Sequence, residues 1–222
     1  YDYFLNSTTR VKLKRYCPLT NITPFLNECS QLRKLSLESA YEIEELSKLT
    51  CLRQLECLAL VNQDVDYTWF FQAVFEKCEM LRCLVIINGY PLKDEIFRCA
   101  DWTGLRSLVL RRCSVNGSFL ELLGTELVHL DLEGCSLIQE EYFSQFYQRV
   151  TGMRFIDVRE VPLSGECLGN MMNYLGQLNY LGMADQPYLN AENLRNLTSL
   201  HNLTFLELSG PCLTYETLDL IF

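Results

Sequence analysis

Two segments of the chain, 105–115 and 127–137, follow one residue pattern: leucine at the first, fourth and sixth positions, cysteine at the ninth and an aliphatic residue at the eleventh. Side chains alternate between the two faces of a strand, so Leu108 and Leu110 of the first copy share a face. Together with Leu105 they predict a short strand with a buried side, followed by a turn that places Cys113 inside the bend. The chain therefore repeats one small structural unit.

The pattern can be aligned nine times along the chain, with the first and seventh copies degenerate. The first positions of the copies are Thr8, Leu32, Leu55, Leu81, Leu105, Leu127, Met153, Leu178 and Leu203. Neighbouring copies are 22 to 26 residues apart, within the range of about 20 to 29 that is typical of leucine-rich repeats. Because repeat arrays grow without dividing into domains, we predict one α/β leucine-rich repeat solenoid of about nine repeats over 1–222. Its parallel strands are expected on the concave face and its helices on the convex face.

The turn after each strand varies from copy to copy. Only two of the nine ninth positions hold cysteine, and none holds asparagine. A continuous ladder of asparagine side chains is therefore excluded, and we expect an irregular arch.

Between the strands, apolar residues recur every three or four positions, which is the spacing of an amphipathic helix that packs on a sheet. The clearest examples are Trp69, Phe70, Ala73, Val74 and Cys78, and then Tyr142, Phe143, Phe146, Tyr147 and Val150. Asn190 is a favourable N-cap for a helix that begins at Ala191. Pro24 is expected in the first turn of another helix.

Charge and hydropathy limit the partners of the chain. The 222 residues carry a net charge of −9, which opposes a general affinity for nucleic acid. No apolar run approaches the roughly 20 residues that cross a bilayer, so no membrane partner is expected. The chain begins with tyrosine instead of methionine, and we expect it to be part of a longer protein.

Eleven cysteines are scattered singly, without a C-x-x-C pair. This pattern favours reduced thiols and a cytoplasmic or nuclear protein. Five Asn-x-Ser/Thr tripeptides point the other way, because they are glycosylation acceptors in secreted proteins. They begin at Asn6, Asn21, Asn116, Asn196 and Asn202. An extracellular leucine-rich repeat ectodomain is therefore kept as an alternative.

The third, fifth, seventh and eighth positions of each copy alternate with the buried positions, so they map the concave face. Along the array this face is basic in the first copy, apolar in the third and fourth, and acidic with aromatic residues toward the end. Because neighbouring strands lie about 4.8 Å apart, Phe155, Tyr180 and Phe205 are expected to form a ladder across three strands. An apolar patch between opposite charges is typical of a protein-binding surface. The alternative is that a flanking segment of the longer chain covers the patch.

We predict that a protein partner binds this concave face. The expected contact residues are Val85, Ile87, Val109, Arg111, His129, Asp131, Phe155, Asp157, Tyr180 and Phe205. Aromatic and arginine side chains carry much of the binding energy in protein interfaces. The basic strip at 10–15 is interpreted as a solvated face.

The residues do not indicate catalysis. The chain has two histidines, His129 and His201, about three repeats apart. His129 and Asp131 share a strand face and could act as acid and base, but such pairs arise by chance on a concave face, so we expect no enzyme activity. Cys57 and Cys83 hold the same position in adjacent copies, and two thiols without further ligands do not form a zinc site. We therefore expect neither a metal nor a cofactor.

The copies at 105–115 and 127–137, with cysteine at the turn, resemble ribonuclease-inhibitor-like, cysteine-containing leucine-rich repeats. Such repeats are typical of F-box/leucine-rich-repeat proteins and of Zyg-eleven-like substrate receptors of cullin-RING ubiquitin ligases. They also occur in tropomodulin-like, NOD-like receptor and ribonuclease-inhibitor proteins. The resemblance implies that the concave face holds a substrate while another domain binds the ligase components. A stand-alone intracellular regulatory or inhibitory scaffold is the alternative.

Overall fold

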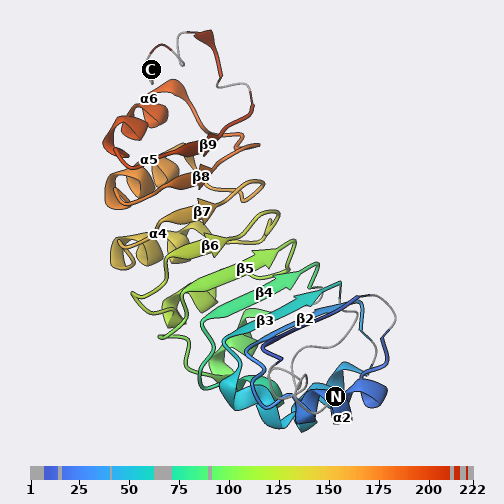
Figure 1. The fold of residues 1–222 in the computed structure, drawn as a ribbon. Coiled ribbons are helices and arrows are strands. Elements are labelled where there is room, and N and C mark those ends of the chain that lie inside the picture. Colours follow the sequence, from blue (N-terminus) through green and yellow to red (C-terminus); the bar gives the residue numbers. More distant parts are fainter. Residues whose placement is uncertain are drawn as a thin grey trace.

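A computed structural model shows nine parallel strands in one sheet, arranged in chain order (Figure 1). The structure describes residues 8–14, 17–40, 42–62, 72–89, 92–210, 213–215 and 219. The strands are β1 (Arg10–Leu13), β2 (Lys34–Glu38), β3 (Cys57–Val61), β4 (Cys83–Ile87), β5 (Ser107–Arg111), β6 (His129–Asp131), β7 (Phe155–Asp157), β8 (Tyr180–Gly182) and β9 (Phe205–Glu207). All nine strands lie where the repeat pattern predicts them, and the predicted leucine-rich repeat solenoid is confirmed.

Equal positions of successive repeats face each other across the sheet. Leu84 pairs with Leu108, and Leu108 pairs with Leu130. These leucines are fully buried, and Leu105 and Leu110 belong to the same continuous core. The register has a direct consequence for the concave face, because side chains at one position of the repeat form a row that runs across the strands.

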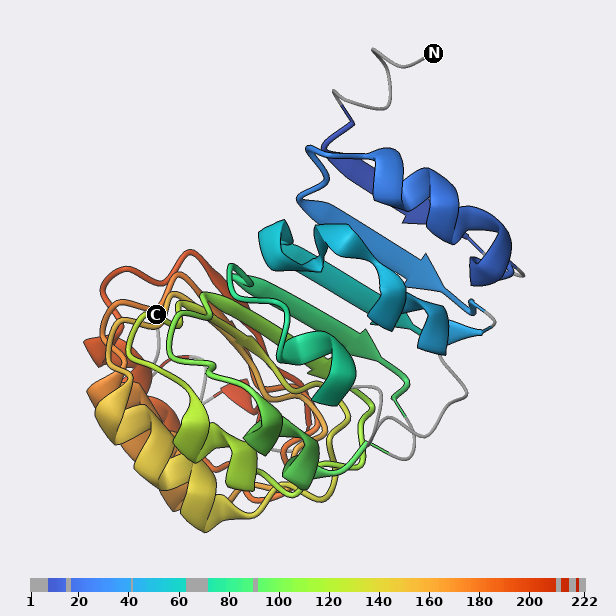
Figure 2. The same cartoon turned by 90° about the horizontal axis from the view of Figure 1, so that it is seen from below.

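Helices cover the other face of the sheet (Figures 1 and 2). They are α2 (Leu19–Glu28), η1 (Ile43–Lys48), η2 (Thr50–Gln54), η3 (Asp94–Cys99), η4 (Ser118–Leu122), α4 (Glu140–Arg149), α5 (Gly165–Tyr174), α6 (Ala191–Leu194) and η5 (Arg195–Ser199), where η marks a 3₁₀ helix. The helix predicted around Tyr142 is confirmed as α4. Of the other predicted helix, residues 72–75 are helical and Val74 is buried, whereas Trp69 and Phe70 lie outside the described residues. Within the described segments, every helix is too short or too polar to cross a membrane.

The two predicted helix starts differ in outcome. Asn190 is the N-cap of α6, and its side chain accepts from the backbone N–H of Asn193 at 3.0 Å, as predicted. The position predicted for Pro24 is wrong, because α2 begins at Leu19 and Pro24 is its sixth residue. Proline removes one helical N–H donor, which leaves the carbonyl of Thr20 without its helical partner, and Thr20 is exposed to water.

The eighth position of the repeat has a left-handed backbone wherever the structure describes it. The residues concerned are Ser39, Asn62, Asn88, Arg112, Gly134, Glu160, Asp185 and Gly210. This conformation costs roughly 1–2 kcal/mol for most residues, and inter-repeat hydrogen bonds offset it. The N–H of Asn62, for example, donates to the carbonyl of Ile87 at 2.9 Å, and that of Asn88 to Arg111 at 2.9 Å. The eighth position therefore belongs to a turn that extends the ladder beyond the strand ends.

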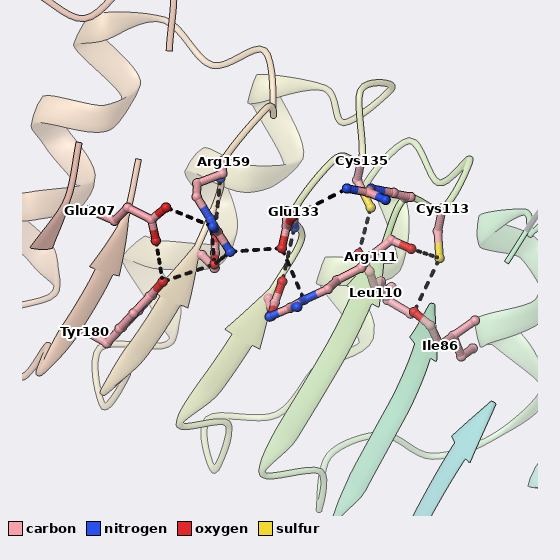
Figure 3. A network of polar contacts seen from close by, with 12 residues as sticks. Ile86, Leu110, Arg111, Cys113, Glu133, Cys135, Arg159, Tyr180 and Glu207 are labelled. Carbon is pink, nitrogen blue, oxygen red and sulfur yellow. Dashed lines mark hydrogen bonds and ion pairs between the residues drawn. The ribbon is translucent and has the colours of Figure 1, made fainter. Parts of the chain in front are cut away.

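The ninth position links successive repeats from inside the arch. The thiol of Cys135 donates to the carbonyl of Leu110 at 2.8 Å, and that of Cys113 to Ile86 at 3.6 Å (Figure 3). The expectation that the turn cysteines lie inside the bend is confirmed. The amide of Gln186 makes the corresponding bond, to the carbonyl of Val158, two repeats after Cys135, so glutamine replaces cysteine in the same structural role.

Candidate protein-binding face

An aromatic ladder runs along the concave face from β6 to β9. Its ring centroids are separated by 4.0 Å between His129 and Phe155, 4.0 Å between Phe155 and Tyr180, and 4.9 Å between Tyr180 and Phe205. Neighbouring rings are inclined by only 7° to 13°. All four residues hold the third position of the repeat, so the sheet register places them in one row. The predicted stack of three rings is confirmed, and His129 extends it.

His129 is the first ring of this aromatic ladder, on β6. Burial lowers the pKa of its imidazole below the ordinary value, although Asp131 acts in the opposite direction. Its Nε2 is buried and has no hydrogen-bond partner among the described residues. A neutral ring suits this position, because protonation would place a charge in a poorly solvated stack.

Arg159 is the centre of an ion-pair network beside the ladder (Figure 3). Its guanidinium contacts the carboxylate of Asp157 at 2.7 Å, that of Glu133 at 2.9 Å and that of Glu207 at 2.9 Å. The hydroxyl of Tyr180 lies 3.2 Å from Glu207. The hydrogen bonds to Asp157 raise the pKa of Arg159 further. Arg159 therefore links three repeats directly, and the hydroxyl of Tyr180 joins the repeat between them to the same carboxylates.

A second arginine continues the network toward β5. Arg111 contacts the buried carboxylate of Asp131 through Nη2 at 2.6 Å and through Nε at 2.7 Å. Its Nε also lies 3.4 Å from Glu133, which therefore sits between Arg111 and Arg159. The hydrogen bonds to Asp131 raise the pKa of Arg111. Positive and negative side chains thus alternate across successive strands.

Two of the expected contact residues need correction. Asp131 and Asp157 are only 1% and 0% exposed, so their carboxylates do not present charge to a partner. They lie under Arg111 and Arg159, which neutralise them. The surface expected to be acidic is therefore a network in which Arg111 and Arg159 offset part of the negative charge of four carboxylates. Its partly exposed members are the two arginines, Glu133 and Glu207.

Glycine at position 182 makes room for the buried carboxylate. Gly182 pairs with Asp157 across β7 and β8, and a β carbon at position 182 would lie 2.8 Å from Oδ1 of Asp157. That separation is shorter than a real contact, so any larger residue would displace the carboxylate. The Gly182 and Arg159 positions are parts of the site that the sequence pattern alone did not single out.

Carboxylate oxygens of Asp131, Glu133 and Asp157 lie within 4.8 Å of one another. Each of these carboxylates also contacts a guanidinium group. The positive charge that such a cluster requires is therefore supplied by arginine, and we assign no metal to it.

An apolar patch lies on β3, β4 and β5. It consists of half-buried side chains at the third, fifth and seventh positions: Cys57, Ala59, Val61, Cys83, Val85, Ile87 and Val109. Beyond it, Arg10, Lys12, Lys14 and Lys34 are exposed on or beside the first two strands. The sheet register makes the patch continuous with the aromatic ladder, because Ser107 pairs with both Cys83 and His129.

Comparisons with known proteins agree with this architecture. A chain from the crystal structure of the Rad7 and Elc1 complex in yeast matches with a TM-score of 0.82 and 18% identity, over 99% of this chain and 61% of that chain. An internalin (InlF) from Listeria monocytogenes matches with a TM-score of 0.51 and 15% identity, over 99% of this chain and 86% of the internalin. Neither a family model nor a curated protein sequence matches. By its fold, the chain is a leucine-rich repeat protein.

Proposed function

We propose that the array is a protein-interaction module that holds a partner on its concave face. The observation that carries this proposal is the continuous row from the apolar patch to the aromatic ladder. Its last ring, Phe205, is 53% exposed. Rigid aromatic side chains lose little conformational entropy on binding, which makes them good anchors. We expect Val85, Ile87 and Val109 to supply the apolar contacts.

The charged residues of the concave face indicate which kind of partner segment it can bind. Among the fully exposed side chains on and beside the strands, the clearest excess of charge is positive and lies at the β1 and β2 end. A partner segment with apolar side chains followed by acidic ones would match the face in that order. Its association rate should fall as salt is added, because the matching charges are solvent-exposed.

We further propose that the partner is a substrate of a cullin-RING ubiquitin ligase, and that this chain is the substrate-recognition part of its adaptor, acting by binding and not by catalysis. Two points support this reading: the resemblance of the cysteine-containing repeats to ligase receptors, and the fold shared with a chain from a complex that contains Elc1. The chain spans 61% of that yeast chain, and we propose that ligase contacts are made outside the repeat array. The cytoplasm or nucleus is the corresponding location.

The test is affinity purification of the full-length protein, followed by quantitative mass spectrometry. The wild type should recover a cullin, its linker subunit and at least one further protein. The variant Val85→Glu/Val109→Glu should keep the cullin and the linker but lose the further protein. Val128→Glu is a matched control, because Val128 is 37% exposed and lies outside the concave rows. Absence of any cullin from the wild-type sample would leave a stand-alone scaffold and reject the ligase assignment.

The ectodomain alternative loses part of its basis in the structure. The side-chain nitrogen of Asn196 donates to the carbonyl of Gly169 at 3.0 Å, and that of Asn202 to Gly176 at 3.1 Å. These are the atoms that would carry a glycan. A glycosidase-induced mass shift at Asn21, which is exposed on α2, would restore the alternative.

A further inference from the structure

Cys57 and Cys83 form a pair of thiols within the apolar patch. They lie directly opposite each other on β3 and β4, and both are half-buried. The Cα atoms of neighbouring strands are about 4.8 Å apart, within the span of about 4.4 to 6.8 Å that a disulfide bridges. A thiol–thiol hydrogen bond is the largest cause of the pKa shift of each of the two sulfurs. Joining their sulfurs would therefore need little movement of the backbone.

The neighbouring strands make the two thiols unequal. Lys34 is the strand partner of Cys57, and Ser107 is that of Cys83. The hydrogen bond from Cys57, aided by Ser107 and Lys34, outweighs burial and lowers the pKa of Cys83 to about 6. The same hydrogen bond raises the pKa of the Cys57 thiol. Cys83 is therefore the more acidic thiol of the pair, and Cys57 is the less acidic one.

We propose that Cys57 and Cys83 form a modification site for hydroperoxides, which convert the pair into a reversible disulfide. The Cys83 thiolate attacks a peroxide oxygen and breaks the O–O bond. Cys83 becomes a sulfenic acid, and the leaving alkoxide or hydroxide takes up a proton. The sulfur of Cys57 then attacks the sulfenic sulfur, and the hydroxyl group leaves as water with the Cys57 proton. Two thiols are oxidised, and one hydroperoxide is reduced to an alcohol (water in the case of hydrogen peroxide) and water.

A second pair of thiols provides an internal control. Cys113 and Cys135 also hold equal positions in adjacent repeats, and interaction with the Cys135 thiol likewise lowers the pKa of Cys113. This pair differs from Cys57 and Cys83 in access to solvent. Cys113 and Cys135 are buried, at 3% and 0% exposure, and their thiols donate to backbone carbonyls inside the arch. The position of Cys57 and Cys83 on the open face is thus what distinguishes the proposed site.

The experiment exposes the reduced full-length protein to hydrogen peroxide, blocks the remaining thiols, and maps disulfides by mass spectrometry. We expect the Cys57–Cys83 disulfide to form at least about tenfold faster than Cys113 and Cys135 are consumed, because a reactive thiol needs access as well as thiolate character. Dithiothreitol should restore both thiols. Equal rates for the two pairs, or no bridge between Cys57 and Cys83 in the folded protein, would overturn the proposal.

Single variants test the order of the steps. In Cys57→Ser, a sulfenic acid should accumulate on Cys83 and react with dimedone, since the resolving thiol is missing. In Cys83→Ser, Cys57 should remain unlabelled under the same conditions. The opposite labelling pattern would refute the assignment of Cys83 as nucleophile. Circular dichroism of each variant checks the fold.

One consequence rests on the proposed function. A disulfide within the apolar patch would change the surface offered to a partner, so oxidised and reduced protein should differ in partner affinity. The chemistry itself is measured without any partner. Failure of the proposed function would therefore leave the disulfide result intact, and failure of the disulfide would not affect the binding proposal.

Discussion

Replacing Arg159 by methionine should lower the free energy of unfolding more than most single substitutions on a protein surface do. The guanidinium makes three contacts of 2.7 to 3.0 Å with the carboxylate of Asp157, which is 0% exposed. Without it, the carboxylate would keep the backbone N–H of residue 159 at 3.2 Å and the hydroxyl of Tyr180 at 3.4 Å. Removing one partner of a buried pair costs about 3–5 kcal/mol. Because two weaker donors remain, we expect a loss near the lower limit, about 3 kcal/mol.

Urea unfolding followed by circular dichroism measures this loss. Arg53→Met is the matched control, because Arg53 pairs with Glu79 at 3.8 Å and both side chains are mostly exposed, so its loss should stay below about 1 kcal/mol. The double variant Asp157→Asn/Arg159→Met should recover at least half of the stability, since no buried charge is left. A loss below about 1 kcal/mol for Arg159→Met alone would refute the argument that Asp157 depends on this arginine.

Three further predictions concern the same half of the array. Gly182→Ala should destabilise the protein by about 1–3 kcal/mol through overpacking against Asp157, whereas Gly176→Ala, which has no neighbour within 4 Å, should be nearly neutral in the same urea assay. The pKa of His129 is lower in the folded than in the unfolded protein. The free energy of unfolding should therefore keep its full His129 contribution above about pH 6.5 and decrease as the pH drops below it. Equal pH dependence of the wild type and His129→Gln would contradict this. Gln186→Leu should cost about 0.5–1.5 kcal/mol, since the carbonyl of Val158 loses one of its two donors and keeps the N–H of Val161 at 3.1 Å. An unchanged urea midpoint would show that the amide of Gln186 does not stabilise the fold.

The repeat spacing was sufficient to predict the strands and the aromatic ladder. Phe155, Tyr180 and Phe205 hold the same position of successive repeats. The parallel register pairs them across neighbouring strands, so their rings stack. Their separation then follows from strand spacing and not from details of packing. The same reasoning placed the thiol of Cys135 inside the arch, because the ninth position follows the last buried leucine at a fixed distance.

The burial of Asp131 and Asp157 was not predictable from alternation alone. The strands shorten from five residues in β5 to three in β6 and β7, and the arginines then fold back over the carboxylates. A signal was nevertheless present, since Arg111, Glu133 and Arg159 alternate in charge at the seventh position of three successive repeats. Residues at equal positions are neighbours, so this alternation indicates ion pairs across strands and not a surface of one charge.

The left-handed turn at the eighth position also escaped the sequence pattern. Asparagine and glycine favour that conformation, but Arg112 and Glu160 adopt it as well, so residue type gives no uniform signal. The inter-repeat hydrogen bonds impose it. Tertiary structure here overrides local preference, as it does for Pro24 inside α2.

The most direct test of the central claim is the affinity of a purified partner for Phe155→Ala/Tyr180→Ala, measured by calorimetry beside the wild type and Tyr188→Ala. Tyr188 is 65% exposed and lies outside the ladder. We expect the double variant, confirmed as folded, to bind at least about 30-fold more weakly, corresponding to a loss of about 2 kcal/mol, and the control to bind like the wild type. Unchanged affinity in the folded double variant would show that the partner does not bind the aromatic ladder.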